Sequence, residues 1–282
     1  MLQLDDVQKL ACPLCHGSLG FRGFVAGNWL DKGALTCSSC GEHYRVAKGL
    51  GRLFRDRDVR GTERFLRRIY DGVPWLHDPL VALTFPFLHD EPEEQSRLRY
   101  LARLSVDDLT TDASPNGLIR ILEVSVGTGA NVGLLRRHLP TGLPVEIWGI
   151  DFSEGMLDIA RQRTINSGDT QTRLVMADAH ALPFADNFFQ RVFHVGGING
   201  FRQPDKALLE MSRVAQPGTP IVVVDEQLDP DRRHDVINRT AFRFLTWFDG
   251  DPHSPIEHLP PHAQVIADEQ IGPFFYCLTF RT

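Results

Sequence analysis

The chain has 282 residues, of which 42% are hydrophobic and 23% are charged. This composition is typical of a globular protein and excludes the disordered and fibrous classes. The formal net charge is −6, which disfavours nucleic acid as the main partner, because proteins that bind many phosphates are usually basic. The N-terminal residues lack the features of a secretory signal, and no apolar run approaches the about 20 residues that span a bilayer. We therefore expect a cytoplasmic protein without a membrane span, in which paired cysteines bind metal instead of forming disulfides.

Two CxxC pairs dominate residues 1–53, the first expected domain. Cys12 and Cys15 form one pair and Cys37 and Cys40 form the other, in the pattern C-x2-C-x21-C-x2-C. Each pair can offer two thiolates to one ion from a tight knuckle, and two knuckles close a tetrahedral Zn²⁺ site. Because four thiolates leave no coordination position open, we expect a structural zinc ribbon, whose ion supplies folding energy to a segment with little core of its own.

The fifth cysteine and two histidines carry weaker signals. His16 and His43 lie beside the knuckles and could replace a ligand. With four cysteines present, we expect both histidines on the surface or hydrogen-bonded to the metal site. Cys277 falls in a late apolar run and is expected to be a core thiol.

Residues 54–112 form a charged segment that we expect to be a helical cap over a substrate. Arg64–Ile69 and Gln95–Leu104 place apolar residues three and four apart, as an amphipathic helix requires. The stretch from Ser105 to Gly117 is polar and ends in Ser-Pro-Asn-Gly, which predicts a boundary made of turns.

Residues 113–282 alternate between strand-like and helix-like stretches, with an insertion at about residues 227–261. Continuous apolar strands alternating with helices predict parallel strands that are covered on both faces. The expected fold class is α/β, a doubly wound, Rossmann-like and mostly parallel sheet with a small N-terminal zinc ribbon, whose ligand lies beyond the carboxyl ends of the strands. The expected strands are Leu118–Val124, Val145–Ile150, Thr172–Ala177, Phe188–Val195 and Ile221–Val224, and the expected helices are Val132–Leu139, Glu154–Gln162 and Pro204–Val214.

The stretch from Glu123 to Asn131 leads from a strand into a helix through a turn of small residues. Small residues let the backbone approach a ligand closely. A dinucleotide fingerprint would need its third glycine at Val132, so a pyrophosphate is a poor fit. Glu123, at the strand end, suits a cationic or amino-acid ligand better.

This stretch resembles motif I of the class I methyltransferases, (E/D)xGxGxG, with a serine in place of the first glycine. The resemblance implies S-adenosylmethionine as the cofactor. It also implies which residues of the loop contact that cofactor, namely Glu123, Ser125, Gly127, Thr128 and Gly129.

Later stretches resemble further motifs of the same family, in the family's order. Asp151 ends the second strand and is implied to bind both ribose hydroxyls, because a carboxylate can accept two hydrogen bonds at once. Phe152 would flank the adenine. Asp178 would accept a hydrogen bond from the adenine amino group, and the backbone of Ala179 would reach a ring nitrogen.

An upstream stretch is similar to the YDxxAxxYD segment that closes over the cofactor in small-molecule methyltransferases. Tyr70 opens the stretch and is implied to contact the cofactor, while His77 replaces the second tyrosine and Asp78 is kept. Downstream of Asp151, Ser153 is placed to cap the next helix.

The methyl group of a sulfonium is already activated, so such an enzyme mainly aligns the nucleophile and excludes water. A general base helps only where the nucleophile must lose a proton. His194, in the fourth strand, is the candidate for that base and for a cofactor contact, with Asp225 and Glu226 as alternatives. The competing interpretation is a histidine that is simply hydrogen-bonded within the strand.

The acceptor is expected to be a small molecule. The fourth strand ends in His-Val-Gly-Gly-Ile-Asn and lacks the (N/D)PP(Y/F) tetrapeptide of many amino-nitrogen methyltransferases. The region instead resembles quinone, lipid and natural-product C- and O-methyltransferases. The insertion carries aromatic residues that line an apolar pocket or form plain core, namely Phe242, Phe244, Trp247 and Phe248.

Two alternatives stay open. The CPLC…CSSC layout followed by Ala47–Leu50 resembles that of ribosomal guanine-N1 methyltransferases, and the stretch Tyr44–Tyr70 is rich in Lys and Arg. These features would suit an rRNA or tRNA base methyltransferase that binds phosphates with its ribbon and with Tyr44–Tyr70, which we call the basic strip. The other alternative is a non-catalytic interaction protein that binds the cofactor, which the largely intact motifs disfavour.

Overall fold

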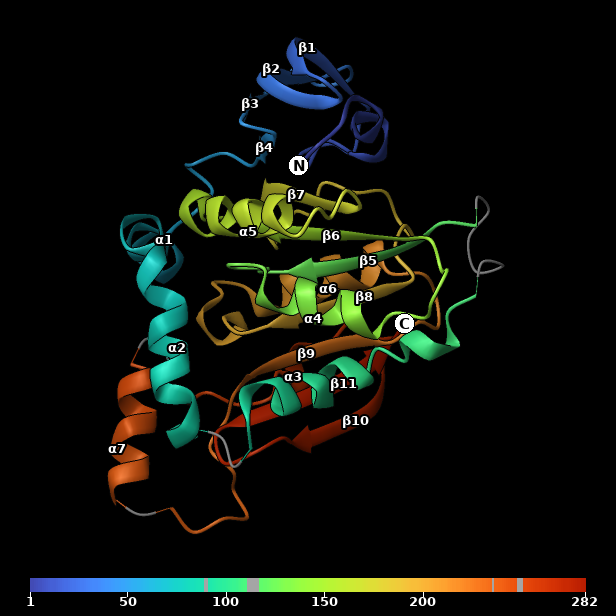
Figure 1. Ribbon diagram of the computed structural model, residues 1–282. Coiled ribbons are helices and arrows are strands. Elements are labelled where there is room, and N and C mark those ends of the chain that lie inside the picture. The colour runs from blue at the N-terminus through green and yellow to red at the C-terminus, as the bar shows by residue number, and fades with distance from the viewer. Residues whose placement is uncertain (89–90, 111–116, 235, 248–250) are drawn as a thin grey trace.

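The computed structural model describes residues 1–88, 91–110, 117–234, 236–247 and 251–282. Their strands form one 11-stranded sheet in the order β1-β2-β3-β4-β7-β6-β5-β8-β9-β11-β10 (Figure 1). The strands are β1 Leu19–Ala26, β2 Trp29–Cys37, β3 His43–Ala47, β4 Leu50–Leu53, β5 Ile119–Val124, β6 Val145–Asp151, β7 Thr172–Ala177, β8 Arg191–Val195, β9 Ile221–Glu226, β10 Gln264–Gln270 and β11 Phe275–Arg281. The α-helices are α1 Gly61–Gly72, α2 Pro74–Leu88, α3 Glu93–Ala102, α4 Ala130–His138, α5 Glu154–Asn166, α6 Pro204–Val214 and α7 Val236–Leu245.

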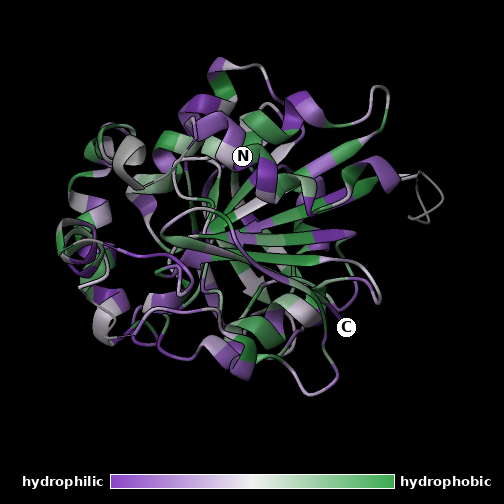
Figure 2. Cartoon of the chain, turned by 90° about the horizontal axis from the view of Figure 1, so that it is seen from below, coloured by the Kyte–Doolittle hydropathy of each residue, from purple (hydrophilic) through white to green (hydrophobic). Residues whose placement is uncertain are grey.

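The central strands β7, β6, β5, β8 and β9 run parallel. Side chains of β5 alternate between two cores: Leu122 and Val124 pack with α6, whereas Ile119 and Ile121 pack with α3, α4 and α5. Hydrophobic colour accordingly follows the strands through the middle of the molecule (Figure 2). The predicted doubly wound, mostly parallel sheet is therefore confirmed, because both of its faces are covered.

The N-terminal ribbon is continuous with this sheet. Its last strand, β4, pairs in parallel with β7, where Arg52 lies opposite Met176 and Leu53 lies opposite Ala177. Tyr44 of the ribbon and Trp148 of β6 belong to the same buried cluster. The ribbon thus extends the edge of the sheet and shares its core.

The C-terminal edge of the sheet is antiparallel, with β11 lying between β9 and β10. Cys277 lies in β11 at 1% exposure, so the predicted core thiol is confirmed. The fourth parallel strand begins at Arg191 and not at Phe188, which corrects the predicted boundary. The chain turns at Asn187 with φ of 57°, and the backbone N–H groups of Phe188 and Phe189 both donate to the carbonyl of Val214, which removes them from the ladder.

Helices α1, α2 and α3 occupy the segment predicted to be a helical cap. The predicted turn boundary from Ser105 to Gly117 begins with a short 3-10 helix at Val106–Asp108, and residues 111–116 of it lie outside the described residues, as does Phe248. No helix among the described residues is long and apolar enough to cross a membrane.

Candidate functional site

The loop between β5 and α4 places three residues in the left-handed backbone region. The φ angles are 60° at Ser125, 53° at Gly127 and 75° at Gly129. Glycine adopts this region without cost, whereas a residue with a Cβ atom is strained there. The serine that replaces the first glycine of the motif therefore keeps the glycine's backbone conformation.

Asp151 ends β6 beside this loop. Its Oδ2 accepts a hydrogen bond of 2.9 Å from the backbone N–H of Gly127, and its Oδ1 accepts one of 2.8 Å from that of Ser153. Burial raises the pKa of Asp151 to about 6, although these N–H donors act in the opposite direction. The Oγ of Ser153 accepts a hydrogen bond of 3.2 Å from the N–H of Met156, which confirms the predicted N-cap of α5.

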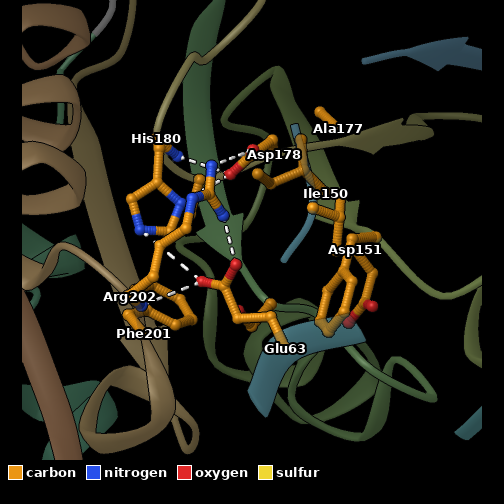
Figure 3. A pocket seen from close by; sticks show the side chains of 12 residues that line it. Glu63, Ile150, Asp151, Ala177, Asp178, His180, Phe201 and Arg202 are labelled. Atoms are coloured by element: carbon orange, nitrogen blue, oxygen red, sulfur yellow. Dashed lines mark hydrogen bonds and ion pairs between the residues drawn. The ribbon is translucent and has the colours of Figure 1, made fainter. Parts of the chain in front are cut away.

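A pocket lies at the carboxyl ends of β6 and β7 (Figure 3). It brings together five of the residues predicted to bind the cofactor, namely Ser125, Asp151, Phe152, Asp178 and Ala179. The other lining residues are Val59, Glu63, Ile150, Ala177, His180, Phe201 and Arg202. This position at the strand ends is where doubly wound sheets bind their ligands.

A charged network that the sequence analysis missed forms one wall of the pocket (Figure 3). Arg202 donates to Asp178 at 2.6 Å and also to Glu63 of α1. His180 Nδ1 lies 2.6 Å from Asp178, and His180 Nε2 lies 3.6 Å from Glu63. Burial opposes ionisation of Asp178, but hydrogen bonds from His180 and Arg202 outweigh it and lower the pKa to about 2.

Two aspartates of the upstream segment fasten α1 and α2 onto the cofactor loops. Asp71 accepts hydrogen bonds from Ser153 Oγ at 2.7 Å and from the N–H of Gly155 at 3.1 Å. Asp78 accepts one from Thr128 Oγ1 at 2.9 Å and another from Arg163. Residues far apart in the sequence therefore close one side of the site.

Tyr70 of α1 is largely shielded from solvent. Burial raises the pKa of its hydroxyl to about 12, and the carboxylates of Glu226, Asp151 and Asp225 add to this shift. Its ring meets that of His77 edge-on at 6.2 Å. Carboxylates at the ends of both β6 and β9 thus act on the Tyr70 hydroxyl, although Tyr70 does not line the pocket.

Glu123 is buried behind the loop. Its Oε1 accepts a hydrogen bond of 2.7 Å from Asn131 Nδ2, while its Oε2 has no hydrogen-bond partner among the described residues. Burial raises the pKa of Glu123 to about 8. An unsatisfied buried carboxylate oxygen is costly, and an ammonium ligand would satisfy it.

His194 is completely buried in β8. Its Nδ1 lies 3.0 Å from the carbonyl oxygen of Val124, its Nε2 has no partner among the described residues, and burial lowers its pKa. The ring packs edge-on against Phe201 at 5.3 Å, and it is Phe201 that lines the pocket. The role of His194 as a base or cofactor contact stays a prediction.

Asp225 and Glu226, at the end of β9, differ in their partners. Asp225 accepts hydrogen bonds from the backbone N–H groups of Gly197 and Asn199, at 3.1 and 2.8 Å, and so holds the turn after β8. The Oε2 of Glu226 is buried without a partner among the described residues. Burial, followed by the charge of Asp225, raises the pKa of Glu226 well above its usual range.

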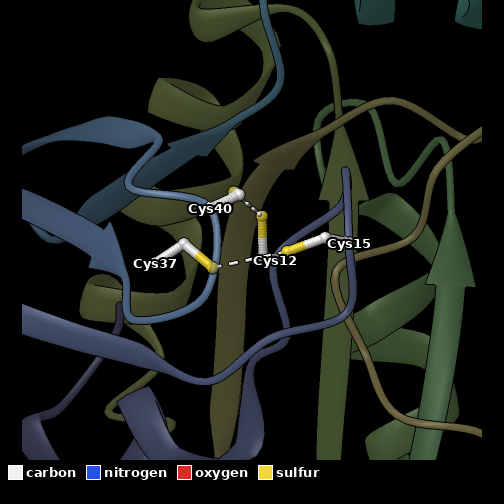
Figure 4. A group of neighbouring side chains, drawn as sticks. All are labelled: Cys12, Cys15, Cys37 and Cys40. Atoms are coloured by element: carbon white, nitrogen blue, oxygen red, sulfur yellow. Dashed lines mark hydrogen bonds between the residues drawn. The ribbon is translucent and has the colours of Figure 1, made fainter.

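The four cysteines of the ribbon converge (Figure 4). Their Sγ atoms lie within 4.8 Å of one another, with 3.7 Å between Cys12 and Cys40 and 3.5 Å between Cys15 and Cys37. A tetrahedral ion with Zn–S bonds of about 2.3 Å would place its sulfurs about 3.8 Å apart, so this donor set fits zinc. No histidine belongs to the cluster in the described part of the chain, and His43 Nδ1 instead lies 2.9 Å from Thr36 Oγ1.

The described aromatic residues of the insertion do not share one environment. Phe242 is buried and stacks on Phe274 at 5.6 Å, whereas Phe244 is 82% exposed and Trp247 is 59% exposed. The interpretation of all these residues as plain core is therefore wrong for Phe244 and Trp247. Phe244 of α7 and Trp247, just after it, are therefore largely exposed, although the ring of Trp247 also contacts Phe65 of α1.

Comparisons with known proteins agree with this geometry. Residues 122–223 match the family model of the methyltransferase domain, and residues 10–49 match that of Trm112p-like proteins. Ubiquinone/menaquinone biosynthesis C-methyltransferases of Burkholderia mallei and Burkholderia pseudomallei are 32% identical over 129 residues, which is 45% of this chain and 51% of theirs. The chain therefore matches about half the length of these curated relatives.

Solved structures share the fold at low identity. A phosphoethanolamine N-methyltransferase 2 of Haemonchus contortus matches 88% of this chain and 55% of its own, with a TM-score of 0.56 and 19% identity. A SAM-dependent methyltransferase of Aquifex aeolicus matches 73% of this chain and 97% of its own, with a TM-score of 0.51 and 16% identity. The chain thus contains a methyltransferase domain with the Rossmann-like fold. A Trm112p-like segment that contains the four clustered cysteines precedes this domain.

Proposed function

We propose that this protein transfers a methyl group from S-adenosylmethionine to the carbon or oxygen of a small apolar acceptor, such as a quinone, a lipid or a natural-product-like compound. One observation carries the proposal: Asp151, Phe152 and Asp178 line a single pocket, at the positions that bind ribose and adenine in the family they resemble. The similarity to C-methyltransferases of quinone biosynthesis supports the acceptor class.

The residues at the pocket fit this cofactor. The carboxylate of Asp151 has lone pairs beyond those that accept the two N–H groups, so it can also accept ribose hydroxyls. Asp178 has similar capacity beyond its bonds to His180 and Arg202. The unpartnered Oε2 of Glu123 suits the ammonium of the cofactor's methionine part.

The bound cofactor would supply a methyl group already activated on a sulfonium, so the protein's own task is orientation and exclusion of water. Helices α1 and α2, held by Asp71 and Asp78, would exclude water from one side. Where the acceptor must lose a proton, Glu226 is a second candidate base beside His194. Burial and the charge of Asp225 raise its pKa well above the usual range, and its Oε2 has no hydrogen-bond partner among the described residues.

We also propose that the ribbon holds a structural Zn²⁺ through Cys12, Cys15, Cys37 and Cys40. The spacing of the sulfurs supports this ion, and four thiolates leave no position for a substrate.

RNA base methylation is the second candidate. The similarity of residues 10–49 to Trm112p-like proteins and the basic strip Tyr44–Tyr70 favour it. Against it, Arg52 and Arg67 are paired with Asp56, and Arg55 is paired with Asp58, so part of the strip is neutralised internally. A non-catalytic interaction protein is the third candidate.

An experiment with a labelled methyl group distinguishes the three candidate functions. Purified protein is incubated with methyl-labelled S-adenosylmethionine and cell extract, and products are divided into RNA and organic-soluble fractions. Label in the organic fraction is expected, whereas label in RNA that is lost on RNase treatment would favour the second candidate. In parallel, calorimetry should give Asp151→Asn at least tenfold weaker cofactor binding, with Asp205→Asn on α6 as the matched control. Binding without label in either fraction would favour the third.

A further inference from the structure

Helices α1, α2 and α7 lie on one side of the molecule (Figure 1), and we call the large apolar side chains that are exposed on them and just after α7 the cap face. Its main members are Phe65, Trp75, Leu80, Leu83, Phe244 and Trp247. Trp75 is 66% exposed and Leu83 is 68% exposed. Monomeric proteins rarely expose apolar residues in such a cluster unless another phase or molecule covers them.

Side chains of the cap face connect α1 with the end of α7. Phe65 of α1 and Trp247, just after α7, meet edge-on with ring centroids 5.7 Å apart. Helix α2 follows α1 directly, and α7 lies at the same side of the molecule (Figure 1). Helix α2 is rich in apolar residues, and its Trp75, Leu80 and Leu83 are exposed at the surface. Exposed apolar residues on a surface helix commonly mark a site where another molecule or a membrane binds.

Arginines accompany the apolar residues at helical spacing. Arg64 and Arg68 are exposed on α1, and Arg239 and Arg243 are exposed on α7. None of the four has an ion-pair partner among residues 1–88, 91–110, 117–234, 236–247 and 251–282.

Acidic groups on the three helices do not offset this positive charge. Glu63 is buried against Arg202, while Asp71 and Asp78 are bound to the cofactor loops. Helix α7 contains no acidic residue. The cap face is therefore positive although the chain as a whole carries a net charge of −6.

We propose that the cap face docks on the surface of an anionic lipid bilayer. Exposed apolar side chains can enter the acyl boundary, and the arginines attract anionic headgroups. Tryptophan favours that interface because its ring is apolar and its N–H is polar. Charge complementarity selects this occupant over a second copy of the chain, because two positive cap faces would repel each other.

The test uses the full-length protein with vesicles of phosphatidylglycerol and phosphatidylcholine, and with vesicles of phosphatidylcholine alone. Co-sedimentation should occur with the anionic vesicles and weaken as salt is added. Tryptophan emission should shift to the blue on binding, and Trp75→Phe/Trp247→Phe should abolish that shift while Trp29 and the buried Trp148 remain.

Two sets of variants test the two parts of the surface. Replacing Arg64, Arg68, Arg239 and Arg243 with Gln should weaken binding at least tenfold, as should Phe244→Ser combined with Leu83→Ser. The matched control is Lys206→Gln/Leu209→Ser on α6, which removes an exposed cation and an exposed leucine elsewhere and should leave binding unchanged.

Three outcomes would overturn the proposal. The first is no binding to anionic vesicles, and the second is an equal loss of binding in the control. The third is a dimer in solution that Phe244→Ser dissociates, without any affinity for vesicles, which would identify a second copy as the occupant. Vesicle binding is measured without cofactor or acceptor, so its failure is distinguishable from failure of the methyl-transfer proposal.

Discussion

Glu123→Gln should stabilise the folded protein at alkaline pH and weaken its binding of cofactor. Glu123 is 1% exposed, and burial, partly opposed by the hydrogen bond from Asn131, raises its pKa from 4.5 to about 8. Between these values the unfolded chain has released a proton that the folded chain retains, so the folded state loses stability as the pH rises. At full ionisation the loss is about 4–5 kcal/mol, an upper bound because a buried site relaxes.

Glutamine matches the protonated side chain in shape and keeps the acceptor for Asn131, but it never ionises. Urea unfolding at pH 5 should therefore give similar free energies for the variant and the wild type. At pH 8.5 the variant should be more stable by about 2–4 kcal/mol. Calorimetry should show at least tenfold weaker binding of S-adenosylmethionine, because the amide offers no charge to the ammonium.

The matched control is Glu94→Gln, at a carboxylate that is 63% exposed and 3.1 Å from Arg137. An exposed pair contributes little, so its free energy of unfolding should change by less than about 1 kcal/mol at either pH. If Glu123→Gln gains no stability over the wild type between pH 5 and pH 8.5, the argument from a buried, proton-retaining carboxyl is wrong.

Three further perturbations test the loop, the charged network and the ribbon. Ser125→Gly should raise the free energy of unfolding by about 0.5–1 kcal/mol in thermal denaturation, because glycine relieves the left-handed backbone strain at φ of 60°. Arg202→Met should lower the free energy of unfolding by about 2–4 kcal/mol, because Glu63 and Asp178 lose the cation that they share. It should also raise the pKa of Asp178 above about 2, as followed by carboxyl NMR. Removal of zinc by a chelator should lower the free energy of unfolding by at least about 3 kcal/mol. It should also speed amide hydrogen exchange at Leu53.

Each of these three perturbations has its own control or contradicting outcome. Ser167→Gly, at a right-handed position, should not stabilise, and a similar gain there would make the Ser125 result a general effect of glycine. Arg202→Lys should recover part of the stability, and an unchanged pKa of Asp178 in Arg202→Met would show that Arg202 does not hold that carboxylate. Chelation without faster exchange at Leu53 would mean that β4 is held independently of the ion.

The elements and the metal cluster were predictable because their signals are local. The CxxC pairs predicted that Cys12 and Cys37 belong to one cluster, because the spacing of metal ligands is visible in the sequence itself. The alternation of apolar runs and helices predicted the parallel sheet at the core, because this pattern is also local in the sequence. Asp151 and Asp178 then came to one pocket because parallel strands end at one edge of a sheet.

The charged wall of the pocket was not predictable from the sequence. Glu63 occupies a helix with mostly exposed neighbours, and Arg202 follows a short 3-10 turn, so no periodicity singles out either residue. Their pairing depends on how α1 docks against the end of β7, which is a tertiary contact. The aromatic residues of α7 were misjudged for a related reason. Hydrophobic spacing reports that a face is apolar and does not report whether anything covers it.

The pairing of β4 with β7 connects the ribbon to the pocket more directly than the sequence suggested. Leu53 is fixed opposite Ala177, and Ala177 itself lines the pocket beside Asp178. From Leu53 the chain runs to Val59 and then to Glu63, and both residues also line the pocket. A Zn²⁺ ion held by the four thiolates would therefore stabilise the segment that positions Glu63 against Arg202. A zinc ion in the ribbon, although it touches no substrate, would set the geometry of the cofactor pocket through a short stretch of chain.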